Sequence, residues 1–562
     1  MGGALLAALA VVWARLSEPP TPDVAWLLYA AGVLRDGGTL GVDVVENSPP
    51  IIFWLKLPVL AIGDLLGLSA WPSWIGALLV LSLASALLVG RLSKSLACGA
   101  HLGLLAVAVF ILLPGREFGQ REHVALVLTV PWLVAIARRL EGRPAEGAGL
   151  WMTIVLAAAG LGIKPHFGLV WLAVACLLAA RARSFRALLR PEVTGVALLG
   201  VAQVVAVAIL HPSYFEHLRL YGRAYVGFLA IPISQALFVG AGPAAVLFAL
   251  LARVALRGSR DRTAEGSAAL LVGAIGFWLA AGLQQKGWPY HYLPAQGIAL
   301  LAVGALLVET PVALMRLAPR IYRAAGVGAL VMALLTPAVH AVLQAARLEP
   351  ADRSGLDRNL EVLLPIVRAA GQVGPVFVFS TNIASSFPLV SEAGARWAFR
   401  HPSLLMLGAA YSRQLDSAGM VRPRPLAERT AAERRLAGEL AADLRDHRPA
   451  AILVVRPDEG NPGWGGAKRF DYLAYFQAEP QFTRILSDYK DAGVIGDYSL
   501  LLRDGVTVPV EPGHMLTASE HRFAVGFGGG RVRWTVDPLG LVLFGLGFGV
   551  AYGVGGRGRE VG

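Results

Sequence analysis

Charged residues are scarce in this 562-residue sequence, where they make up only 16% of the total. Hydrophobic residues account for 56%, and the mean hydropathy is +0.58. Soluble globular domains carry about a quarter charged residues. The composition therefore excludes a protein that is soluble throughout, and it indicates an integral membrane protein.

Cysteine is almost absent, with only Cys98 and Cys176 in the chain. Both lie in or beside apolar runs, which argues against a disulfide framework and against a thiolate metal site. We interpret both as small hydrophobic residues that are buried in the protein.

Long polar stretches are missing from the first 345 residues. A bilayer core of roughly 30 Å requires about 20 apolar residues per helix, and runs of nearly this length recur here. We expect about twelve transmembrane spans. Their predicted positions are 2–16, 71–90, 101–114, 123–140, 148–163, 167–181, 193–210, 233–253, 267–284, 292–310, 324–344 and 536–555.

Two apolar segments need separate interpretation. The first span is short and has Arg15 near its end, so either it lies shallowly in the membrane or the true start of the chain is upstream. No basic segment precedes it, which argues against a cleaved signal peptide. The segment 51–68 contains Lys56, Pro58 and Asp64, which favour a helix in the membrane interface over one more span.

The net charge of +12 is unevenly distributed. Lysine and arginine cluster in alternate loops, as Arg91 and Lys94; Arg138, Arg139 and Arg143; Arg181, Arg183, Arg186 and Arg190; Arg253, Arg257, Arg260 and Arg262; Arg316, Arg320 and Arg323; Arg557 and Arg559. Cytoplasmic loops of membrane proteins are enriched in these residues. The pattern predicts that both termini and the basic loops are cytoplasmic, and it explains the charge without a nucleic-acid partner.

The composition changes near residue 345, beyond which charge is frequent. Short β-rich runs at 376–381, 451–456 and 499–504 alternate with helical stretches such as 430–447, which indicates a small α/β domain. We therefore expect a transmembrane module at 1–344, an extracytoplasmic α/β domain at 345–535, and a C-terminal span with a cytoplasmic tail at 536–562.

The loops predicted to lie outside collect both carboxylates and cations. The groups of most interest are Asp23, Asp43 and Glu46 in the first loop, Arg116, Glu117, Arg121, Glu122 and His123 in the second, Lys164 and His166 in the third, and Lys286, Tyr290, His291 and Tyr292 in the fifth. A carboxylate beside lipid is costly, so such groups indicate a functional site. Acids and bases on one face suit a reaction between a charged lipid headgroup and a polar acceptor.

The order of short motifs on this face is informative. An acid follows the first span, Glu-x-x-Pro-Pro occupies 46–50, an acid begins the fourth span, Lys-Pro follows the fifth, and Lys-x-x-x-Tyr-x-x-x-Pro occupies 286–294. This order resembles the polyprenyl-phosphate-sugar-dependent glycosyltransferases of the GT-C superfamily, such as the protein mannosyltransferases and the lipid A aminoarabinose transferase. The resemblance covers about the first 310 residues, and the outer domain carries no matching signature.

The resemblance implies a polytopic α-helical membrane protein of GT-C type with a smaller extracytoplasmic α/β domain. It implies transfer of a sugar from a polyprenyl-phosphate-linked donor to an unknown extracytoplasmic acceptor, with membrane lipid around the helices. The bias toward Ala, Gly, Arg and Leu suggests a high-GC bacterial genome, so we expect the bacterial cytoplasmic membrane. The active face and the outer domain would then be extracytoplasmic.

The resemblance also implies individual residue roles. Asp23 falls at the position of the first-loop catalytic acid, although Val24 follows it where the family usually has a second acid. Glu46 matches the Glu-Lys-Pro-Pro step, with Asn47 and Ser48 in place of its lysine. Glu122 falls where the second conserved acid is usually Asp.

The cations match as well. Lys164 falls at a phosphate-contacting lysine, and Lys286 with Tyr292 matches a Lys/Tyr pair near the donor phosphate. Displacement of a lipid phosphate requires cations on the leaving group, and Arg121 is a further candidate for that role. The remaining residues of the predicted substrate-binding set are His291 and Asp43.

The acceptor requires a base, which is carboxylate chemistry. Asp23 is our first choice, with Glu46 or Glu122 orienting the acceptor. The polyprenyl tail requires an apolar groove, for which Phe53 and Trp54 in the interfacial helix are a candidate wall. The four acids Asp23, Asp43, Glu46 and Glu122 are possible oxygen ligands for a divalent cation, but their spacing does not require one. We predict an enzyme without a metal or other cofactor.

Other interpretations remain open at this point. Asp23 is also a good N-terminal signal for the helix that follows it. Arg121 with Glu122 would also suit an ordinary ion pair, Lys164 could snorkel to the interface, and the aromatic residues around His291 could form a belt. A transporter or flippase of amphipathic substrates would place ionisable groups near the bilayer midplane and show two similar halves. Ionisable residues at the outer ends of spans favour the enzyme, and a structural protein would leave them unexplained.

Overall fold

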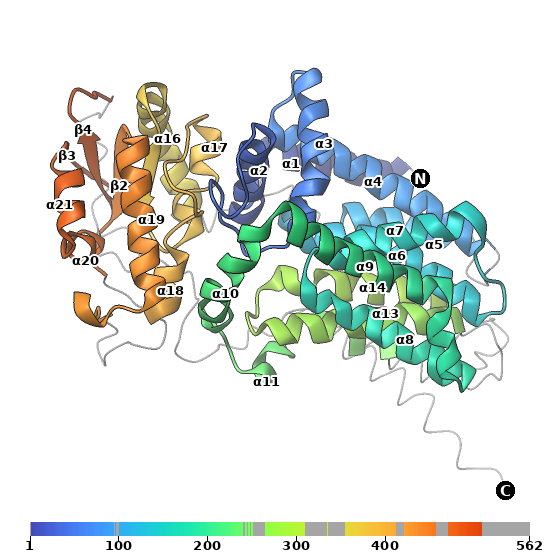
Figure 1. The fold of residues 1–562 in the computed structure, drawn as a ribbon. Helices are drawn as coiled ribbons and strands as arrows, with labels where there is room; N and C mark the ends of the chain where they lie inside the picture. Colours follow the sequence, from blue (N-terminus) through green and yellow to red (C-terminus); the bar gives the residue numbers. More distant parts are fainter. Residues whose placement is uncertain are drawn as a thin grey trace, which may run out of the picture.

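The computed structural model describes residues 2–94, 96, 101–239, 242–243, 245–247, 249–250, 265–309, 334, 355–411, 421–456 and 470–508. Most helices form one bundle, and a small sheet domain lies at one end of it (Figure 1). Helices α2 (Pro22–Arg35) and α10 (Pro212–Gly227) lie between these two parts. The helices of the bundle are α1 (Gly2–Ser17), α4 (Ala70–Ser93), α5 (His101–Ile111), α6 (Arg121–Leu140), α7 (Gly147–Gly162), α8 (Gly168–Ala182), α9 (Pro191–Leu210), α13 (Glu265–Gln284) and α14 (Leu293–Glu309).

In the described part of the chain, 6 helical segments are long and apolar enough to cross a membrane. They are Ala70–Ser93, Arg121–Leu140, Pro165–Ala182, Pro191–Leu210, Ser267–Gln284 and Pro289–Leu307. Each coincides with a span that the sequence predicts, so the polytopic helical architecture is confirmed. The predicted span 324–344, of which only residue 334 is described, and the span 536–555 lie outside the described residues.

Helix α6 is the centre of the bundle and packs against α4, α7, α13 and α14. All of its residues from Arg121 to Ala137 are buried. A helix that is apolar on all sides is expected in the core of a bundle. Its 20 residues extend over about 30 Å. Arg121 therefore lies at the end beside the sheet domain, and Arg138 and Arg139 lie at the opposite end.

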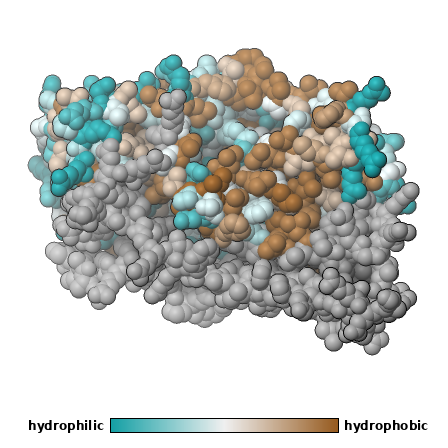
Figure 2. Space-filling view, turned by 90° about the horizontal axis from the view of Figure 1, so that it is seen from below, coloured by the Kyte–Doolittle hydropathy of each residue, from teal (hydrophilic) through white to brown (hydrophobic). Residues whose placement is uncertain are grey.

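The outer face of the bundle is apolar. Figure 2 shows a continuous brown region across the middle of one face, with hydrophilic residues at both ends. Helix α9 exposes Leu198, Val201, Val204 and Ile209 to more than half of their full extent. A band of this kind suits contact with lipid chains.

Cys176 is a free cysteine on the exposed surface of α8, so the prediction that it is buried is wrong. Its apolar surroundings are the outer face of the bundle, because in a membrane protein the outside of a helix is also apolar.

Two predicted segments differ from the spans around them. The segment 51–68 forms α3 (Ile51–Leu65), whose 15 residues extend over about 22 Å, too short to cross a bilayer. The span predicted at 233–253 is interrupted, because α11 covers only Ile233–Ala236 and a turn follows before the helical residues described between 242 and 250.

The outer domain contains one sheet with the strand order β1-β2-β4-β3. Strands β1 (Val376–Phe379) and β2 (Ala451–Val455) are parallel, and β4 (Tyr498–Arg503) pairs antiparallel with β2 and with β3 (Tyr489–Ile495). The helices of this domain are α16 (Gly355–Val373), α17 (Leu389–Glu392), α18 (Leu405–Tyr411), α19 (Ala431–His447), α20 (Tyr472–Gln477) and α21 (Pro480–Leu486). The predicted small α/β domain is confirmed.

Helix α19 connects the sheet to the bundle. Thr430 and Glu433 form a capping box at its beginning, in which each side chain accepts a backbone N–H of the other residue. Glu439 and Asp443 are one helical turn apart and share a face. Asp443 accepts hydrogen bonds from the backbone N–H and the guanidinium group of Arg400, at 2.6–3.2 Å. These contacts fix the segment around residue 400 against α19.

The outer domain contacts the bundle through backbone and side-chain hydrogen bonds. The N–H of Val45 donates to the carbonyl of Arg400 at 2.8 Å. The N–H of Trp397 donates to the Tyr29 hydroxyl, also at 2.8 Å. The ring of Phe387 packs on Trp26 and Tyr29 of α2, with centroids 5.3 and 5.4 Å apart. These contacts hold the domain over the end of the bundle where α6 begins.

Candidate active site

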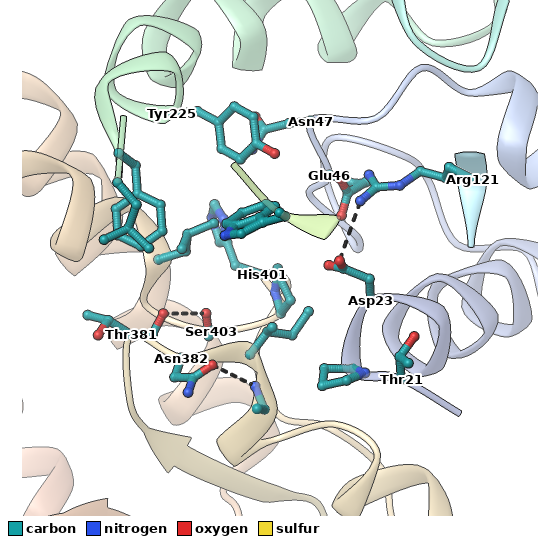
Figure 3. A pocket seen from close by; sticks show the side chains of 18 of the residues that line it. Thr21, Asp23, Glu46, Asn47, Arg121, Tyr225, Thr381, Asn382, His401 and Ser403 are labelled. Carbon is teal, nitrogen blue, oxygen red and sulfur yellow. Dashed lines mark hydrogen bonds and ion pairs between the residues drawn. The ribbon is translucent and has the colours of Figure 1, made fainter. Parts of the chain in front are cut away.

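A cavity of about 510 Å³ lies between the end of the bundle and the outer domain (Figure 3). Segments that are distant in sequence contribute to its walls. The lining residues are Thr21, Pro22, Asp23, Val45, Glu46, Asn47, Arg116, Glu117, Gln120, Arg121, His217, Tyr225, Phe228, Leu229, Trp288, Pro289, Tyr290, Thr381, Asn382, Ile383, Ala384, His401, Pro402, Ser403, Leu405 and Met406. Three of the predicted site residues, Asp23, Glu46 and Arg121, are therefore brought together.

Asp23 lies in the first turn of α2. Pro22 begins this helix, where its fixed backbone angle suits the first helical position. The N-cap position is Thr21, which makes no side-chain capping bond. The carboxylate of Asp23 accepts a hydrogen bond from the Tyr290 hydroxyl at 3.1 Å and lies 3.7 Å from Arg121. Asp23 keeps 30% of its side chain exposed, and it points into the cavity (Figure 3).

Arg121 is the buried cation in the cavity wall. It is the first residue of α6, and its side chain is only 8% exposed. One terminal nitrogen donates to the Ser48 hydroxyl, and the other lies near Asp23. The carboxylate compensates part of the guanidinium charge, which is costly to bury alone. An arginine fork held in this way suits a phosphate, because two parallel N–H groups match two oxygens.

Glu46 is held by three donors. Trp26 donates its indole N–H to one carboxylate oxygen at 2.7 Å. The backbone N–H and hydroxyl of Ser48 donate to the other oxygen, at 2.9 and 3.0 Å. Ser48 thus connects Glu46 to Arg121, and the three residues form a preorganised edge of the cavity.

A second hollow, an apolar groove of about 540 Å³, is lined in part by residues that follow those of the cavity in sequence. Its walls come from α3, α7, α8, α9 and α10, and among them are Trp54, Trp171, Val204, Phe215 and Leu218. The segment 45–51 contributes to both hollows, since Val45 to Asn47 line the cavity and Pro49 to Ile51 line the groove. Of the predicted groove residues, Trp54 lines the groove, whereas Phe53 is buried in the core.

Comparison with known proteins identifies the fold. No protein-family model matches the chain, and no curated protein matches it. Among solved structures, ArnT from Cupriavidus metallidurans bound to undecaprenyl phosphate matches with a TM-score of 0.51 at 13% identity, over 91% of this chain and 98% of that one. The chain has the GT-C fold. The apo form of the same protein matches at 15% identity and a TM-score of 0.45, over 89% of this chain and 97% of that one.

In this GT-C fold, Glu122 faces away from the cavity although Arg121 next to it faces in. Successive residues of a helix point about 100° apart, so the two side chains cannot share one wall. Glu122 is fully buried and accepts a hydrogen bond from Lys164 at 2.5 Å. Lys164 also donates to Gln284 at 2.9 Å, and His291 lies 3.7 Å from the carboxylate. The three predicted residues Glu122, Lys164 and His291 form a buried cluster outside the lining of the cavity.

Three other predicted residues also lie outside the lining of the cavity. The Lys286 ammonium donates to the carbonyls of Tyr225, Val226 and Phe228, and burial lowers its pKa to about 8. The Tyr292 hydroxyl donates to the carbonyl of Ala236. Asp43 is exposed and accepts the N–H of Thr39 at 2.7 Å in a turn. Each side chain fixes a loop around the site, and its predicted contact with substrate stays a prediction.

Glu117 is a further candidate, for which no motif in the sequence predicts a role. It lies in the 3-10 turn η1 (Gly115–Glu117) and lines the cavity. Burial, together with the nearby carboxylates of Asp23 and Glu122, raises its pKa to about 7. A carboxyl group with a pKa near neutrality can take or give a proton under physiological conditions. The signal in the sequence is its place beside Arg116 in the second of the loops that collect charged residues.

The outer domain supplies a second group that sequence reasoning missed. The loop after β1 contributes Thr381 and Asn382, and the segment before α18 contributes His401 and Ser403. In parallel sheets, ligands often bind beyond the carboxyl ends of the strands. No local motif identifies these residues, because they become neighbours only through packing of the domain on α10.

A metal site is not formed by the described residues, among which no group of three or more His, Cys, Asp and Glu side chains is arranged to hold an ion. Of the four predicted oxygen donors, Glu122 is paired with Lys164 and Asp43 is in a surface turn. Catalysis without a metal therefore stays a prediction, which a chelator can test.

Proposed function

We propose that this protein is a membrane glycosyltransferase that moves a sugar from a polyprenyl-phosphate donor to an extracytoplasmic acceptor. The observation that carries this proposal is that a cavity containing the charged side chains of Asp23, Glu46 and Arg121 and an apolar groove share segment 45–51 and α10 in their walls. A lipid-linked sugar phosphate needs both environments, because its tail is apolar and its headgroup is charged. ArnT, which has the same fold, was crystallised with undecaprenyl phosphate.

In the proposed transfer, residues in the cavity wall have separate roles. A hydroxyl or amine of the acceptor attacks the anomeric carbon, a new bond forms there, and the bond from that carbon to the phosphate oxygen breaks. The polyprenyl phosphate leaves with the electron pair, and the proton of the acceptor passes to a base. Asp23 is the proposed base, since its partly exposed carboxylate lines the cavity and lies 3.7 Å from Arg121. Arg121 stabilises the leaving phosphate.

Glu46 and the buried cluster have supporting tasks in this proposal. Glu46 orients the acceptor from the edge that it shares with Ser48. Glu122 and Lys164 form a nearly neutral pair next to Arg121, which leaves the guanidinium as the main cation for the phosphate. Lys286 reaches the phosphate only if it exchanges its present backbone carbonyls for the ligand.

We infer the orientation in the membrane from the charge pattern. The loops that carry Arg138, Arg139 and Arg143 lie at the end of α6 opposite the cavity. Basic loops favour the cytoplasmic side. The cavity and the outer domain then face the extracytoplasmic side of a bacterial cytoplasmic membrane.

The experiment that tests the proposal measures transfer of radiolabelled sugar from a panel of polyprenyl-phosphate sugars, in membranes that contain wild type or Asp23→Asn. The matched control is Asp36→Asn, which removes an exposed carboxylate at the other end of α2. We expect release of label to an acceptor or to water in wild type and in the control, with and without chelator. Loss of the base should lower turnover at least 100-fold in Asp23→Asn, which is the usual order for general-base catalysis.

Two results would contradict the proposal. If no donor turns over in wild type, or if Asp23→Asn is as active as wild type, the base assignment fails. A transporter would instead move intact labelled lipid between leaflets without cleaving it, so the assay also follows the intact donor across vesicle membranes.

A further inference from the structure

The two walls of the cavity differ in charge. The wall from the bundle and its loops carries Asp23, Glu46, Glu117, Arg116 and Arg121. The residues that the described outer domain contributes are Thr381, Asn382, Ile383, Ala384, His401, Pro402, Ser403, Leu405 and Met406. None of them is a carboxylate, a lysine or an arginine. The outer wall is therefore rich in neutral hydrogen-bonding groups, and the inner wall is ionic.

His401 is the most strongly positioned group of the outer wall. Its Nε2–H donates to Glu439 of α19 at 2.8 Å, because a carboxylate can only accept. This bond fixes the ring orientation, and Nδ1 is the ring nitrogen that remains for a further hydrogen bond. The ring packs against Phe399, Tyr221 and His217, with centroids 4.9–5.9 Å apart. Figure 3 shows His401 in the cavity on the side facing Asp23.

Glu439 is held as an anion behind this ring. Burial alone would raise its pKa, but hydrogen bonds from His401 and Arg435 outweigh burial and lower the pKa to about 2. Arg435 donates to one oxygen at 2.5 Å, and the Tyr221 hydroxyl of α10 donates to the other at 3.3 Å. The carboxylate thus joins the outer domain to α10, and its negative charge is compensated within the cluster.

The neighbours of His401 extend the same kind of surface. His217 of α10 pairs with the side-chain oxygen of Asn47 at 3.1 Å, and burial lowers its pKa to about 3, so it is neutral. Asn382 uses its side-chain oxygen to accept the N–H of Ala384 at 3.0 Å, so its NH2 group is the part directed away from that turn. Ser403 donates to the carbonyl of Thr381 at 3.3 Å. These groups offer donors and acceptors without a net charge.

We propose that this outer wall is the acceptor subsite, in which His401, positioned by Glu439, binds a hydroxyl group of a neutral carbohydrate. The inference rests on the proposed glycosyl transfer and adds the substrate class of its acceptor. Neutral donors and acceptors match the alternating hydroxyls of a sugar, and the carboxylate behind His401 makes its ring a better hydrogen-bond partner. A phosphorylated acceptor would find no lysine or arginine among the described residues of this wall.

The test measures binding of small sugars without a donor. Wild-type protein in nanodiscs is titrated with methyl hexosides and with the corresponding 6-phosphates, followed by saturation-transfer NMR. The variants are His401→Phe, which keeps a ring but removes both hydrogen-bonding nitrogens, and His401→Gln, which restores a donor and an acceptor. His447→Gln is the matched control, because His447 is an exposed histidine at the end of α19, the helix that carries Glu439.

We expect wild type to bind neutral hexosides, with affinity about five- to tenfold lower in His401→Phe, the usual value of one hydrogen bond. His401→Gln should recover part of this loss, and His447→Gln should match wild type. Equal binding to wild type and His401→Phe, or no binding of any neutral hexoside to wild type, would overturn the proposal. Tighter binding of the 6-phosphates that also depends on His401 would overturn it as well, since the wall would then hold an anion.

The two proposals fail in different ways. Hydrolysis of the donor by water, measured in wild type and Asp23→Asn without any acceptor, tests the glycosyltransferase function alone. Binding of hexosides tests the subsite alone. A melting curve of each variant distinguishes a lost contact from a misfolded domain.

Discussion

The buried pair of Glu122 and Lys164 gives the sharpest test of how the site is built. Lys164→Met keeps most of the side-chain volume but removes the ammonium that lies 2.5 Å from the fully buried carboxylate. The other carboxylate oxygen of Glu122 has no hydrogen-bond partner in the structure, so the variant would leave a buried carboxylate without its hydrogen-bonded cation. Removal of one partner of such a pair costs about 3–5 kcal/mol. We therefore expect Lys164→Met to be strongly destabilised.

The double variant Glu122→Gln with Lys164→Met removes both charges. Replacement of a whole buried ion pair by neutral groups is often close to neutral in stability. We expect the double variant to recover most of the lost stability, which gives a coupling free energy of about 2 kcal/mol or more. Thermal unfolding in nanodiscs, followed by tryptophan fluorescence, measures all four members of this cycle.

The same cycle separates two roles of Lys164. If the lysine only neutralises Glu122, the double variant will have the same KM for donor as wild type. If the lysine also contacts the donor phosphate, the double variant will be stable but its KM for donor will stay raised. A buried, strongly coupled pair is refuted if the free energy of unfolding of Lys164→Met lies within about 1 kcal/mol of wild type, the value of an exposed pair. It is also refuted if the double variant is as unstable as the single one.

Three further predictions concern the cavity and the groove. Arg121→Gln should raise the KM for donor about tenfold or more, since a charge-assisted hydrogen bond contributes about 1.5–3 kcal/mol; an unchanged KM would remove Arg121 from the phosphate site. Glu117 has a folded pKa of about 7 against an ordinary value of 4.5, so wild type should lose stability as pH rises from about 4.5 to 7, whereas Glu117→Gln should not. Melting temperatures of both proteins between pH 4 and 8 should diverge over this window by the equivalent of about 1–3 kcal/mol and then stay apart. Trp54→Ala should weaken binding of polyprenyl phosphates more than binding of short-chain analogues, because Trp54 lines the groove and not the cavity.

Much of the helical architecture was predictable because the membrane imposes a simple rule on sequence. Helices α4 and α9 follow directly from apolar runs that have a loop rich in lysine and arginine at one end and a loop poorer in these residues at the other. Cys176 shows the limit of that rule, since hydropathy cannot distinguish a lipid-facing residue from one in the core. Strand β3 was missed because it mixes exposed residues such as Lys490 and Asp491 with a register shift in its pairing with β4.

The site was predictable in part for a different reason. Asp23, Glu46 and Arg121 lie close to the ends of helices on one side of the membrane, so loop position alone brings them near each other. The direction in which a loop side chain points is set by tertiary contacts. For this reason Lys286 and Tyr292 face backbone carbonyls instead of the cavity. His401 has no sequence signal, because its partner Glu439 is 38 residues away.

The outer domain and the bundle depend on each other at this cavity. The N–H of Val45 donates to the carbonyl of Arg400. Val45 is next to Glu46, and Arg400 is next to His401. This backbone contact therefore joins the two walls one residue away from each proposed substrate-binding side chain. A second connection runs through Tyr221 and Glu439. A shift of the domain against the bundle would have to break these two bonds. Under the proposed mechanism, the edge that orients the acceptor and the wall that binds it are therefore held in register by the same bonds.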